Sequence, residues 1–309
     1  MADRVLITPR SYGKTDLTFL EQIRKAGYEP VMNPYGRILQ KEEMQRELAD
    51  CAGLIVGVDP CSREVLEQAP HLRAIAKYGV GTDNIDLDFC RKNQIKVSVT
   101  TAANADSVAD MTFALLCACA RRLTVINDLC HQKNWVKVTV LDIFRKKIGI
   151  LGLGAVGKGV AKRARGFEME ILAYDVYPDQ EFAGQYGVAY TDPDTIFEQC
   201  DFITLNLPLR PETEKIVNRE SLSKMKKTAI VINTARGGLV DDAALLDAVE
   251  KGMIAGAGLD VFNEEPPKDE RFYTLENIIL SSHAAASSNG AVEMMTRMAT
   301  ANLLRDLQV

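Results

Sequence analysis

Short apolar runs alternate with helical segments along the first hundred residues. Runs of strand length occur at Val5–Ile7, Leu54–Val58, Leu72–Ala76 and Ile95–Val99. Between them, apolar residues recur at helical spacing, as in Leu17–Ala26, which stops before a glycine that favours a helix C-terminus. Strands that alternate with helices predict a parallel sheet covered by helices.

The rest of the chain repeats this alternation more regularly. One long helical stretch is predicted for about residues 105–133, and a final helix for about residues 290–307. Strand-like runs lie between them at Lys147–Leu151, Ile171–Asp175, Phe202–Asn206, Ala229–Asn233, Gly256–Asp260 and Ile278–Ser281. The pattern predicts an α/β chain with a second doubly wound parallel sheet.

The length of 309 residues favours two domains over a single core. No Pro/Gly/Ser linker marks the boundary, which we place near residues 100–104 and again near residue 285. The predicted domains are residues 1–103 plus 286–309, with the last helix crossing back, and residues 104–285. Two crossing segments allow a hinge with a cleft between the domains.

Composition excludes several classes of protein. Hydrophobic residues make up 47% and charged residues 26%, typical of a soluble globular protein. The net charge of −5 argues against nucleic-acid binding, although single arginines can still hold an anionic substrate. The longest apolar run, Met111–Ala120, is too short to span a membrane, and no secretory signal is evident. Seven scattered cysteines favour reduced thiols and a cytoplasmic protein.

A glycine-rich turn stands at the start of the second sheet. Gly152, Gly154 and Gly157 form G-x-G-x-x-G between a predicted strand and a predicted helix. The first glycine permits a tight turn, the second lets the backbone approach a pyrophosphate, and the third lets helix and strand pack closely. The amides of Ala155 and Val156 would meet the phosphates at the positive end of the helix.

An acidic residue, Asp175, follows about 20 positions later at the end of the next strand. Its carboxylate can accept hydrogen bonds from ribose hydroxyls and would repel a 2′-phosphate. The next three residues, Val-Tyr-Pro, include no arginine, so NAD is favoured over NADP. These features favour a Rossmann-like fold over a simple packing turn capped by Asp175.

Charged residues follow three strands of the second sheet. Of the three histidines, only His283 follows a predicted strand, where ligands bind in open α/β sheets. Arg236 follows a second strand, and Glu265 follows a third. Taken singly, Arg236 and Glu265 could be solvated loop charges. Together, the base, the acid and the cation suit the oxidation of a hydroxy acid.

The chain resembles a known family through several motifs that occur in family order. They are K-Y-G-V-G-T-D-N-I-D from Lys77, N-A-D-S-V-A from Asn104, the glycine turn, N-T-A-R-G-G-L-V-D from Asn233, A-G-L-D-V-F-N-E-E-P from Ala257, and His283. Together they identify a resemblance to the D-2-hydroxyacid dehydrogenases, closest to the D-3-phosphoglycerate dehydrogenase branch.

The resemblance implies catalytic roles. Arg236 would bind the substrate carboxylate and the keto oxygen. His283 would be the general acid and base, and Glu265 would orient it. Glu265 is chosen over Glu264 because it directly precedes proline. Backbone amides of Tyr78, Gly79, Val80 and Gly81 would bind the substrate carboxylate. NAD would be the cofactor, without a metal, bound by Gly152, Gly154, Ala155, Val156, Gly157, Asp175, Leu207, Thr234, Asp260 and His283.

The resemblance also predicts a substrate, 3-phosphoglycerate, and hence a role in serine biosynthesis. One departure is Gly57, where phosphoglycerate-specific members carry an arginine that contacts the phosphate. Lys77, Arg63 or Arg10 could replace it. Glyoxylate, hydroxypyruvate and sulfonated acids remain alternative substrates, and NAD-sensing corepressors are an alternative of another class.

Two further expectations follow from the resemblance. Residues 1–103 plus 286–309 would be the substrate-binding lid domain, and residues 104–285 would bind NAD. The protein would form a homodimer through the apolar helix at Ala109–Ala120. A second departure, Asp110 in place of the usual glutamate, is expected to be harmless.

Overall fold

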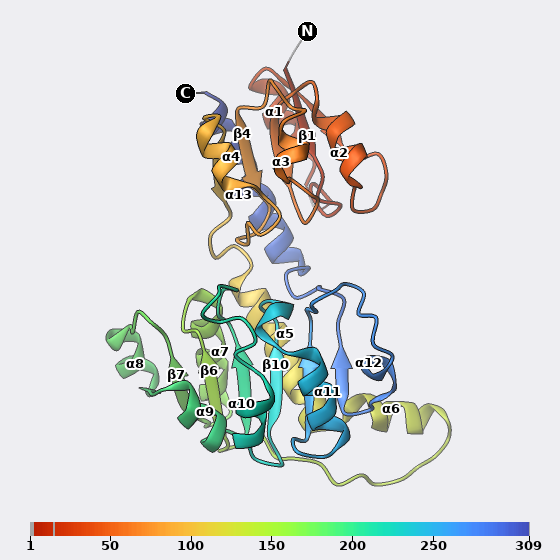
Figure 1. The fold of residues 1–309 in the computed structure, drawn as a ribbon, viewed down its shortest axis with the longest axis vertical. Coiled ribbons are helices and arrows are strands. Elements are labelled where there is room, and N and C mark those ends of the chain that lie inside the picture. The colour runs from red at the N-terminus through yellow and green to blue at the C-terminus, as the bar shows by residue number, and fades with distance from the viewer. Residues whose placement is uncertain (1–2, 15, 309) are drawn as a thin grey trace. The chain divides into compact units, whose positions relative to one another are not determined.

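The computed structural model describes residues 3–14 and 16–308 and divides the chain into two compact units (Figure 1). Unit 1 comprises the residues up to Asn104 and those from Ser287 onward, and unit 2 comprises Ala105–Ala286. Each unit is built around its own parallel β-sheet, so the predicted α/β fold class with two Rossmann-like domains is confirmed.

The sheet of unit 1 has the strand order β2-β1-β3-β4-β5, with every neighbouring pair parallel. Its strands are β1 (Asp3–Ile7), β2 (Tyr28–Met32), β3 (Cys51–Val56), β4 (Ala74–Lys77) and β5 (Lys96–Val99). Its helices are α1 (Thr18–Lys25), α2 (Lys41–Leu48), α3 (Arg63–Leu66), α4 (Leu87–Lys92) and α13 (Asn289–Leu307).

Helices cover both faces of this sheet. Met44 and Leu48 of α2 are fully buried in one cluster with Leu54 of β3. The last helix, α13, packs on β3, β4 and β5, where a Cβ built on Gly53 would lie 3.1 Å from the Leu307 side chain. The C-terminal helix therefore packs in the same unit as the N-terminal part of the chain.

The sheet of unit 2 is also fully parallel, in the order β12-β11-β10-β9-β6-β7-β8. Its strands are β6 (Lys147–Leu151), β7 (Glu170–Tyr174), β8 (Val188–Tyr190), β9 (Phe202–Leu205), β10 (Ile230–Asn233), β11 (Gly256–Leu259) and β12 (Ile278–Leu280). The helices are α5 (Ala105–Ala120), α6 (Leu123–His131), α7 (Ala155–Gly166), α8 (Gln180–Tyr186), α9 (Pro193–Gln199), α10 (Arg219–Lys224), α11 (Asp242–Glu250) and α12 (Arg271–Thr274), with a 3₁₀ turn at Gly237–Leu239.

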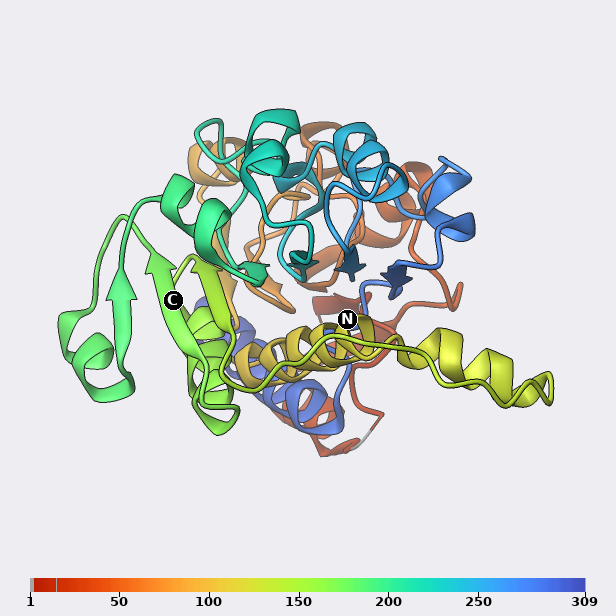
Figure 2. The same ribbon diagram turned by 90° about the horizontal axis from the view of Figure 1, so that it is seen from below.

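Two helical layers enclose the sheet of unit 2. Figure 2 shows α5 and α7 on one face and the helices α9 to α11 on the other. Arg163 of α7 pairs with both Asp106 and Asp110 of α5, which holds these two helices together. The strand order reverses between β6 and β9. The loops at the carboxyl ends of these strands are therefore the expected place for a ligand.

The helical stretch predicted for residues 105–133 is interrupted. Arg122 has φ of +45°, in the left-handed region, and it separates α5 from α6. None of the α6 residues is buried, and α6 extends away from the rest of unit 2 in both views (Figures 1 and 2). Among the helices that the structure describes, none is long and apolar enough to cross a membrane.

Candidate active site

The glycine-rich turn lies directly after β6, at the reversal point of the sheet. Gly152 has φ of +95°, and a Cβ there would lie 2.7 Å from the carbonyl oxygen of Asn206, so only glycine fits. A Cβ on Gly157 would lie 2.0 Å from the Gly152 oxygen, which forces helix and turn into close contact. Gly154, in contrast, faces open space. The tight turn and the space beside Gly154 fit a bound pyrophosphate.

Asp175, which directly follows β7, braces this turn. One carboxylate oxygen accepts a hydrogen bond from the Leu153 amide at 2.7 Å, and the other accepts one from the Tyr177 amide at 2.9 Å. The carboxylate is only half-buried, and each of its oxygens has a second lone pair. Asp175 can therefore shape the nucleotide turn and still accept a ribose hydroxyl, the role predicted for it.

Three other residues predicted to bind the cofactor follow neighbouring strands of unit 2. Leu207 follows β9 and is mostly buried. Thr234 follows β10, and its hydroxyl hydrogen-bonds to that of Thr112 on α5 at 2.8 Å. Asp260 follows β11 and is completely buried. The parallel sheet brings all three to the edge that carries the glycine turn.

His283 and Glu265 meet at this same edge. The His283 Nδ1 atom lies 2.9 Å from Glu265 Oε2 and 3.1 Å from Oε1. Their side chains remain 42% and 39% exposed, so a ligand can still reach them. Because Nδ1 faces the carboxylate, Nε2 is left as the nitrogen that can exchange a proton with a substrate.

A buried carboxylate holds the histidine loop. Asp260 accepts hydrogen bonds from the amides of Ala284 at 2.8 Å and Ala285 at 3.0 Å, and its own carbonyl accepts one from the His283 amide at 2.8 Å. His283 has φ of +55°, which costs a non-glycine residue roughly 1–3 kcal/mol. The three hydrogen bonds to Asp260 stabilise this conformation, so Asp260 directly holds the loop that carries His283.

The pair shifts the pKa of both partners. The hydrogen bond to Glu265 raises the pKa of His283 above 6.5, with help from the charges of Glu265 and Asp260, while burial and Arg236 oppose the shift. Burial alone would raise the pKa of Glu265, but its hydrogen bond to His283 and the nearby positive charges lower it overall. The arrangement favours a protonated imidazole beside an ionised carboxylate.

Arg236 lies close enough to influence both partners electrostatically, and its backbone is fixed by Asn233. The Asn233 side chain donates to the Arg236 carbonyl at 2.8 Å and accepts from the Ala235 amide at 3.1 Å. Asn233 is 1% exposed at the end of β10. No role for Asn233 was predicted from the sequence, although a polar residue at the end of an apolar strand was the available signal.

The loop from Tyr78 to Gly81 follows β4 in unit 1. The Tyr78 amide donates to the Val56 carbonyl, and the Gly79 amide donates to the Thr100 hydroxyl at 2.8 Å. Within the described residues, the amides of Val80 and Gly81 have no hydrogen-bond acceptor. Two of the four amides predicted to bind the substrate are therefore engaged inside unit 1, and two are available.

Gly57, directly after β3, belongs to a polar cluster in unit 1. Its carbonyl accepts hydrogen bonds from the Lys77 ammonium group and from the Asn84 side chain, and Lys77 also donates to Asn84 Oδ1 at 2.8 Å. Among the other basic residues considered for a phosphate, Arg63 pairs with Glu67 at 2.9 Å. Arg10 is exposed in the loop after β1.

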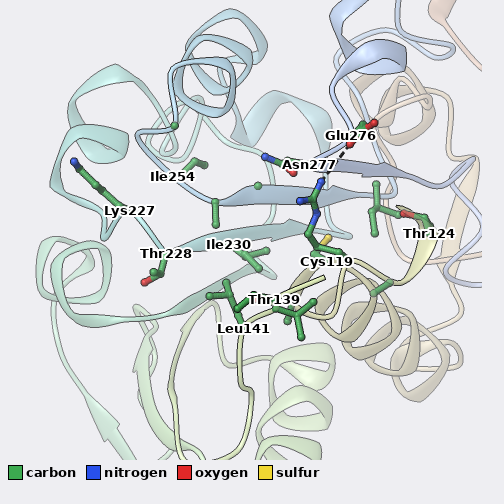
Figure 3. Close-up of a pocket in the computed structure, with 18 residues that line it drawn as sticks. Cys119, Thr124, Thr139, Leu141, Lys227, Thr228, Ile230, Ile254, Glu276 and Asn277 are labelled. Atoms are coloured by element: carbon green, nitrogen blue, oxygen red, sulfur yellow. Dashed lines mark hydrogen bonds and ion pairs between the residues drawn. The ribbon is translucent and has the colours of Figure 1, made fainter. Parts of the chain in front are cut away.

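A separate cavity of about 360 Å³ opens at the opposite, amino-terminal edge of the unit 2 sheet. Figure 3 shows Ile230 and Ile254 in its wall, with Lys227 and Glu276 among the polar residues around it. None of the predicted site residues lines this cavity. In the described part of the chain, no group of three or more His, Cys, Asp or Glu side chains could hold a metal ion.

Comparison with known proteins decides the family. Residues 113–285 match the family described as D-isomer specific 2-hydroxyacid dehydrogenase, NAD binding domain, over more than half of the chain. The chain belongs to this family. It is therefore an NAD-dependent oxidoreductase of 2-hydroxy acids, and its cofactor is NAD.

Several members of this 2-hydroxyacid dehydrogenase family resemble the chain over most of its length. A glyoxylate reductase of Korarchaeum cryptofilum is 39% identical, covering 85% of this chain and 82% of its own, and a hydroxypyruvate reductase of Thermotoga maritima is 38% identical, covering 81% and 83%. A D-3-phosphoglycerate dehydrogenase of Methanocaldococcus jannaschii is 39% identical, covering 82% of this chain but 49% of its own. The D-lactate dehydrogenase of Aquifex aeolicus, solved with NAD and lactic acid, superposes with a TM-score of 0.84 at 29% identity, covering 96% and 93%.

Proposed function

We propose that this 2-hydroxyacid dehydrogenase is a D-specific reductase that converts glyoxylate to glycolate and hydroxypyruvate to D-glycerate with NADH. The observation that carries the proposal is the hydrogen-bonded pair of His283 and Glu265 beside Arg236, at the edge that carries the nucleotide turn. The choice of small, unphosphorylated acids is supported by the glyoxylate and hydroxypyruvate reductases among the relatives. Gly57 supports the same choice, because it offers no cationic side chain to a phosphate.

The proposed chemistry needs a proton donor and an anchor for the carboxylate. Bound NADH supplies the hydride that reduces the keto carbon. His283 in its protonated form donates the Nε2 proton to the keto oxygen, and Glu265, which raises the pKa of His283, stabilises the imidazolium and fixes the ring. Arg236 binds the substrate carboxylate through its planar guanidinium group and polarises the keto oxygen. In the reverse direction His283 accepts the hydroxyl proton.

The two units take different parts in this proposal. Unit 2 binds NADH through the glycine turn and Asp175, with Leu207, Thr234 and Asp260 at the nicotinamide side. Unit 1 contributes the loop from Tyr78 to Gly81, whose available amides at Val80 and Gly81 bind the substrate carboxylate. Residues 1–103 with 286–309 thus act as the lid domain.

The substrate that the sequence analysis favoured, 3-phosphoglycerate, has weaker support. The match to the phosphoglycerate dehydrogenase covers only half of that protein. Lys77 directs its ammonium group to the Gly57 carbonyl and to Asn84, and Arg63 is paired with Glu67, so their hydrogen bonds would have to be exchanged for a phosphate. A role in serine biosynthesis is therefore not part of the proposal.

NADH consumption by the purified protein tests the substrate directly. Glyoxylate, hydroxypyruvate, pyruvate, sulfopyruvate and 3-phosphohydroxypyruvate are compared by kcat/KM. We expect glyoxylate and hydroxypyruvate to exceed the phosphorylated acid by at least tenfold. A preference for 3-phosphohydroxypyruvate would overturn the substrate proposal but keep the chemistry. No reduction of any acid would overturn the proposed activity as a whole.

We also propose that the enzyme is a cytoplasmic homodimer. The helix expected to form the contact, Ala109–Ala120, packs inside unit 2, with Ala109 and Leu116 fully buried. The protruding α6 and the segment after it are better suited, because Leu123 is 59%, Trp135 87% and Val136 52% exposed. Replacing Trp135 with Ser should shift the mass measured by light scattering from dimer to monomer.

The cytoplasmic location that we propose is supported by the cysteines. All seven are free thiols, which suits a reducing compartment.

A further inference from the structure

The loop that carries Glu265 lies directly on the segment that carries Arg236. A Cβ built on Gly237 would lie 2.0 Å from the carbonyl carbon of Phe262 and 2.4 Å from the Asn263 amide nitrogen. The two backbones therefore touch at the residue after Arg236 and at two residues before Glu265. Glycine at 237 permits this approach, but a contact between backbones does not by itself fix one loop against the other.

Asn263 supplies the directional contacts between these segments. Its side-chain amide donates a hydrogen bond to the Val240 carbonyl at 3.1 Å. Its side chain and its backbone amide also lie near the carboxyl group of Asp242, the first residue of α11, where they oppose the rise that burial causes in the pKa of Asp242. These contacts join the Glu265 loop to the segment between Arg236 and α11, although the two are more than 20 residues apart in sequence.

The loop then delivers Glu265 to His283. The Phe262 amide donates to Glu265 Oε1 at 3.2 Å, and the same carboxylate faces His283 Nδ1. Asn263 thus stands between Phe262, which orients the carboxylate, and Glu265 itself. If the loop were released from Val240 and Asp242, the Glu265 carboxylate would lose its fixed direction toward the imidazole.

We propose that Asn263 is a positioning residue of the active site, which holds Glu265 in register with Arg236 through Val240 and Asp242. The consequence for catalysis rests on the proposed function. The consequence for the pKa of His283 does not rest on the proposed function, because this pKa depends only on how the Glu265 carboxylate is placed beside the imidazole. Asn263 touches no reacting atom and acts through Glu265.

Two variants and one control test this role. Asn263→Ala removes the side-chain hydrogen bond to Val240 and the amide group near Asp242, and Asn263→Asp places a second carboxylate near Asp242. Asn277→Ala is the control, because Asn277 is an exposed asparagine of the same unit at the opposite edge of the sheet. Circular dichroism and NADH fluorescence titration establish that each variant is folded and binds the cofactor.

The first readout is the pKa of His283 itself, followed by NMR. The chain has three histidines, so the signal of His283 is assigned by its loss in His283→Ala. Because the hydrogen bond to Glu265 raises this pKa, we expect it to fall in both Asn263 variants and to stay unchanged in Asn277→Ala. An unchanged pKa in both Asn263 variants would overturn the proposal, whether or not the enzyme reduces any keto acid.

The second readout is steady-state kinetics on the best keto acid. Misplacing a catalytic group by about an ångström can lower the rate by about 100-fold, so we expect kcat to fall by about 10- to 100-fold in both Asn263 variants. The Kd for NADH should change less than twofold. Unchanged kcat would overturn the proposal. If the wild-type protein reduces no keto acid, the proposed function fails, while the NMR titration still decides the role of Asn263.

Discussion

Glu265→Gln isolates the negative charge that raises the pKa of His283. The substitution keeps the size of the side chain and its ability to hydrogen-bond, but removes the negative charge beside Nδ1. In the wild-type protein this carboxylate is the main cause that raises the pKa of His283, against burial and Arg236, which lower it. Without the charge, the opposing causes remain, so the pKa of His283 must fall.

The size of this fall follows from the geometry. Two unit charges at the observed separation of 2.9 Å attract by about 1.4 kcal/mol at the dielectric constant of water. That energy corresponds to about one pH unit in the pKa of His283. Both side chains are more than one-third exposed, so screening by solvent and salt makes this value an upper bound. We therefore expect the pKa of His283 to fall, by up to about one pH unit.

The pH dependence of kcat/KM for keto acid reduction measures this shift. Reduction needs a protonated His283, so the rate is present at low pH and is lost as pH rises through the histidine pKa. A lower pKa moves this loss to lower pH. In Glu265→Gln the alkaline limb should therefore shift toward acid, by up to about one pH unit, and the rate on the alkaline side of the profile should fall.

The neighbouring carboxylate provides the matched control. Glu264 is more exposed, pairs with Lys268 at 2.5 Å, and has no contact with His283. Glu264→Gln should leave the alkaline limb where it is. If Glu265→Gln gives the wild-type profile, or if Glu264→Gln produces the shift, then Glu265 does not control the protonation of His283.

Three further substitutions test other parts of the site. Asp175→Ser removes the carboxylate that accepts from the Leu153 amide and is expected to accept from the ribose. KM for NADH should therefore rise by about tenfold, and the preference for NADH over NADPH should shrink. An unchanged ratio of kcat/KM for NADH to that for NADPH would contradict this role. In Gly57→Arg the new Cβ meets only ordinary contacts of 3.7–3.8 Å, so the protein should fold. Its kcat/KM for 3-phosphohydroxypyruvate should rise relative to that for glyoxylate. A fall in this ratio would count against position 57 as a specificity site. Arg236→Lys loses bidentate binding, so KM for the keto acid should rise at least tenfold while NADH binding persists, and an unchanged KM would exclude Arg236 as the carboxylate ligand.

The edge of the sheet that carries the candidate site could be predicted from the sequence because strand polarity is visible in the chain. Parallel strands have their carboxyl ends at one edge, so Arg236, Glu265 and His283, each following a strand, had to lie near one another. The glycine turn was predictable because its conformation requires glycine. A Cβ at Gly152 or at Gly157 would clash with backbone atoms, so the sequence must carry glycine at both positions.

Contacts that depend on loop conformation could not be read from the sequence. Nothing in the pattern indicates that Asn263 reaches back to Val240, or that Asp260 turns inward to hold Ala284 and Ala285. The break between α5 and α6 was also hidden, because Arg122 is a good helix former whose left-handed backbone depends on its surroundings. Likewise, the hydrogen bond from Gly79 to Thr100, which engages one predicted substrate amide, joins residues of different loops.

Analysis of the product most directly tests the claim that His283 and its neighbours perform D-specific reduction with NADH. The wild-type protein and His283→Ala are each incubated with NADH and hydroxypyruvate, and the glycerate formed is resolved by chiral chromatography. We expect D-glycerate in an amount equal to the NADH consumed, and almost none from His283→Ala, although that variant still binds NADH. Formation of L-glycerate, absence of any product from the wild-type protein, or undiminished turnover by His283→Ala would contradict the account.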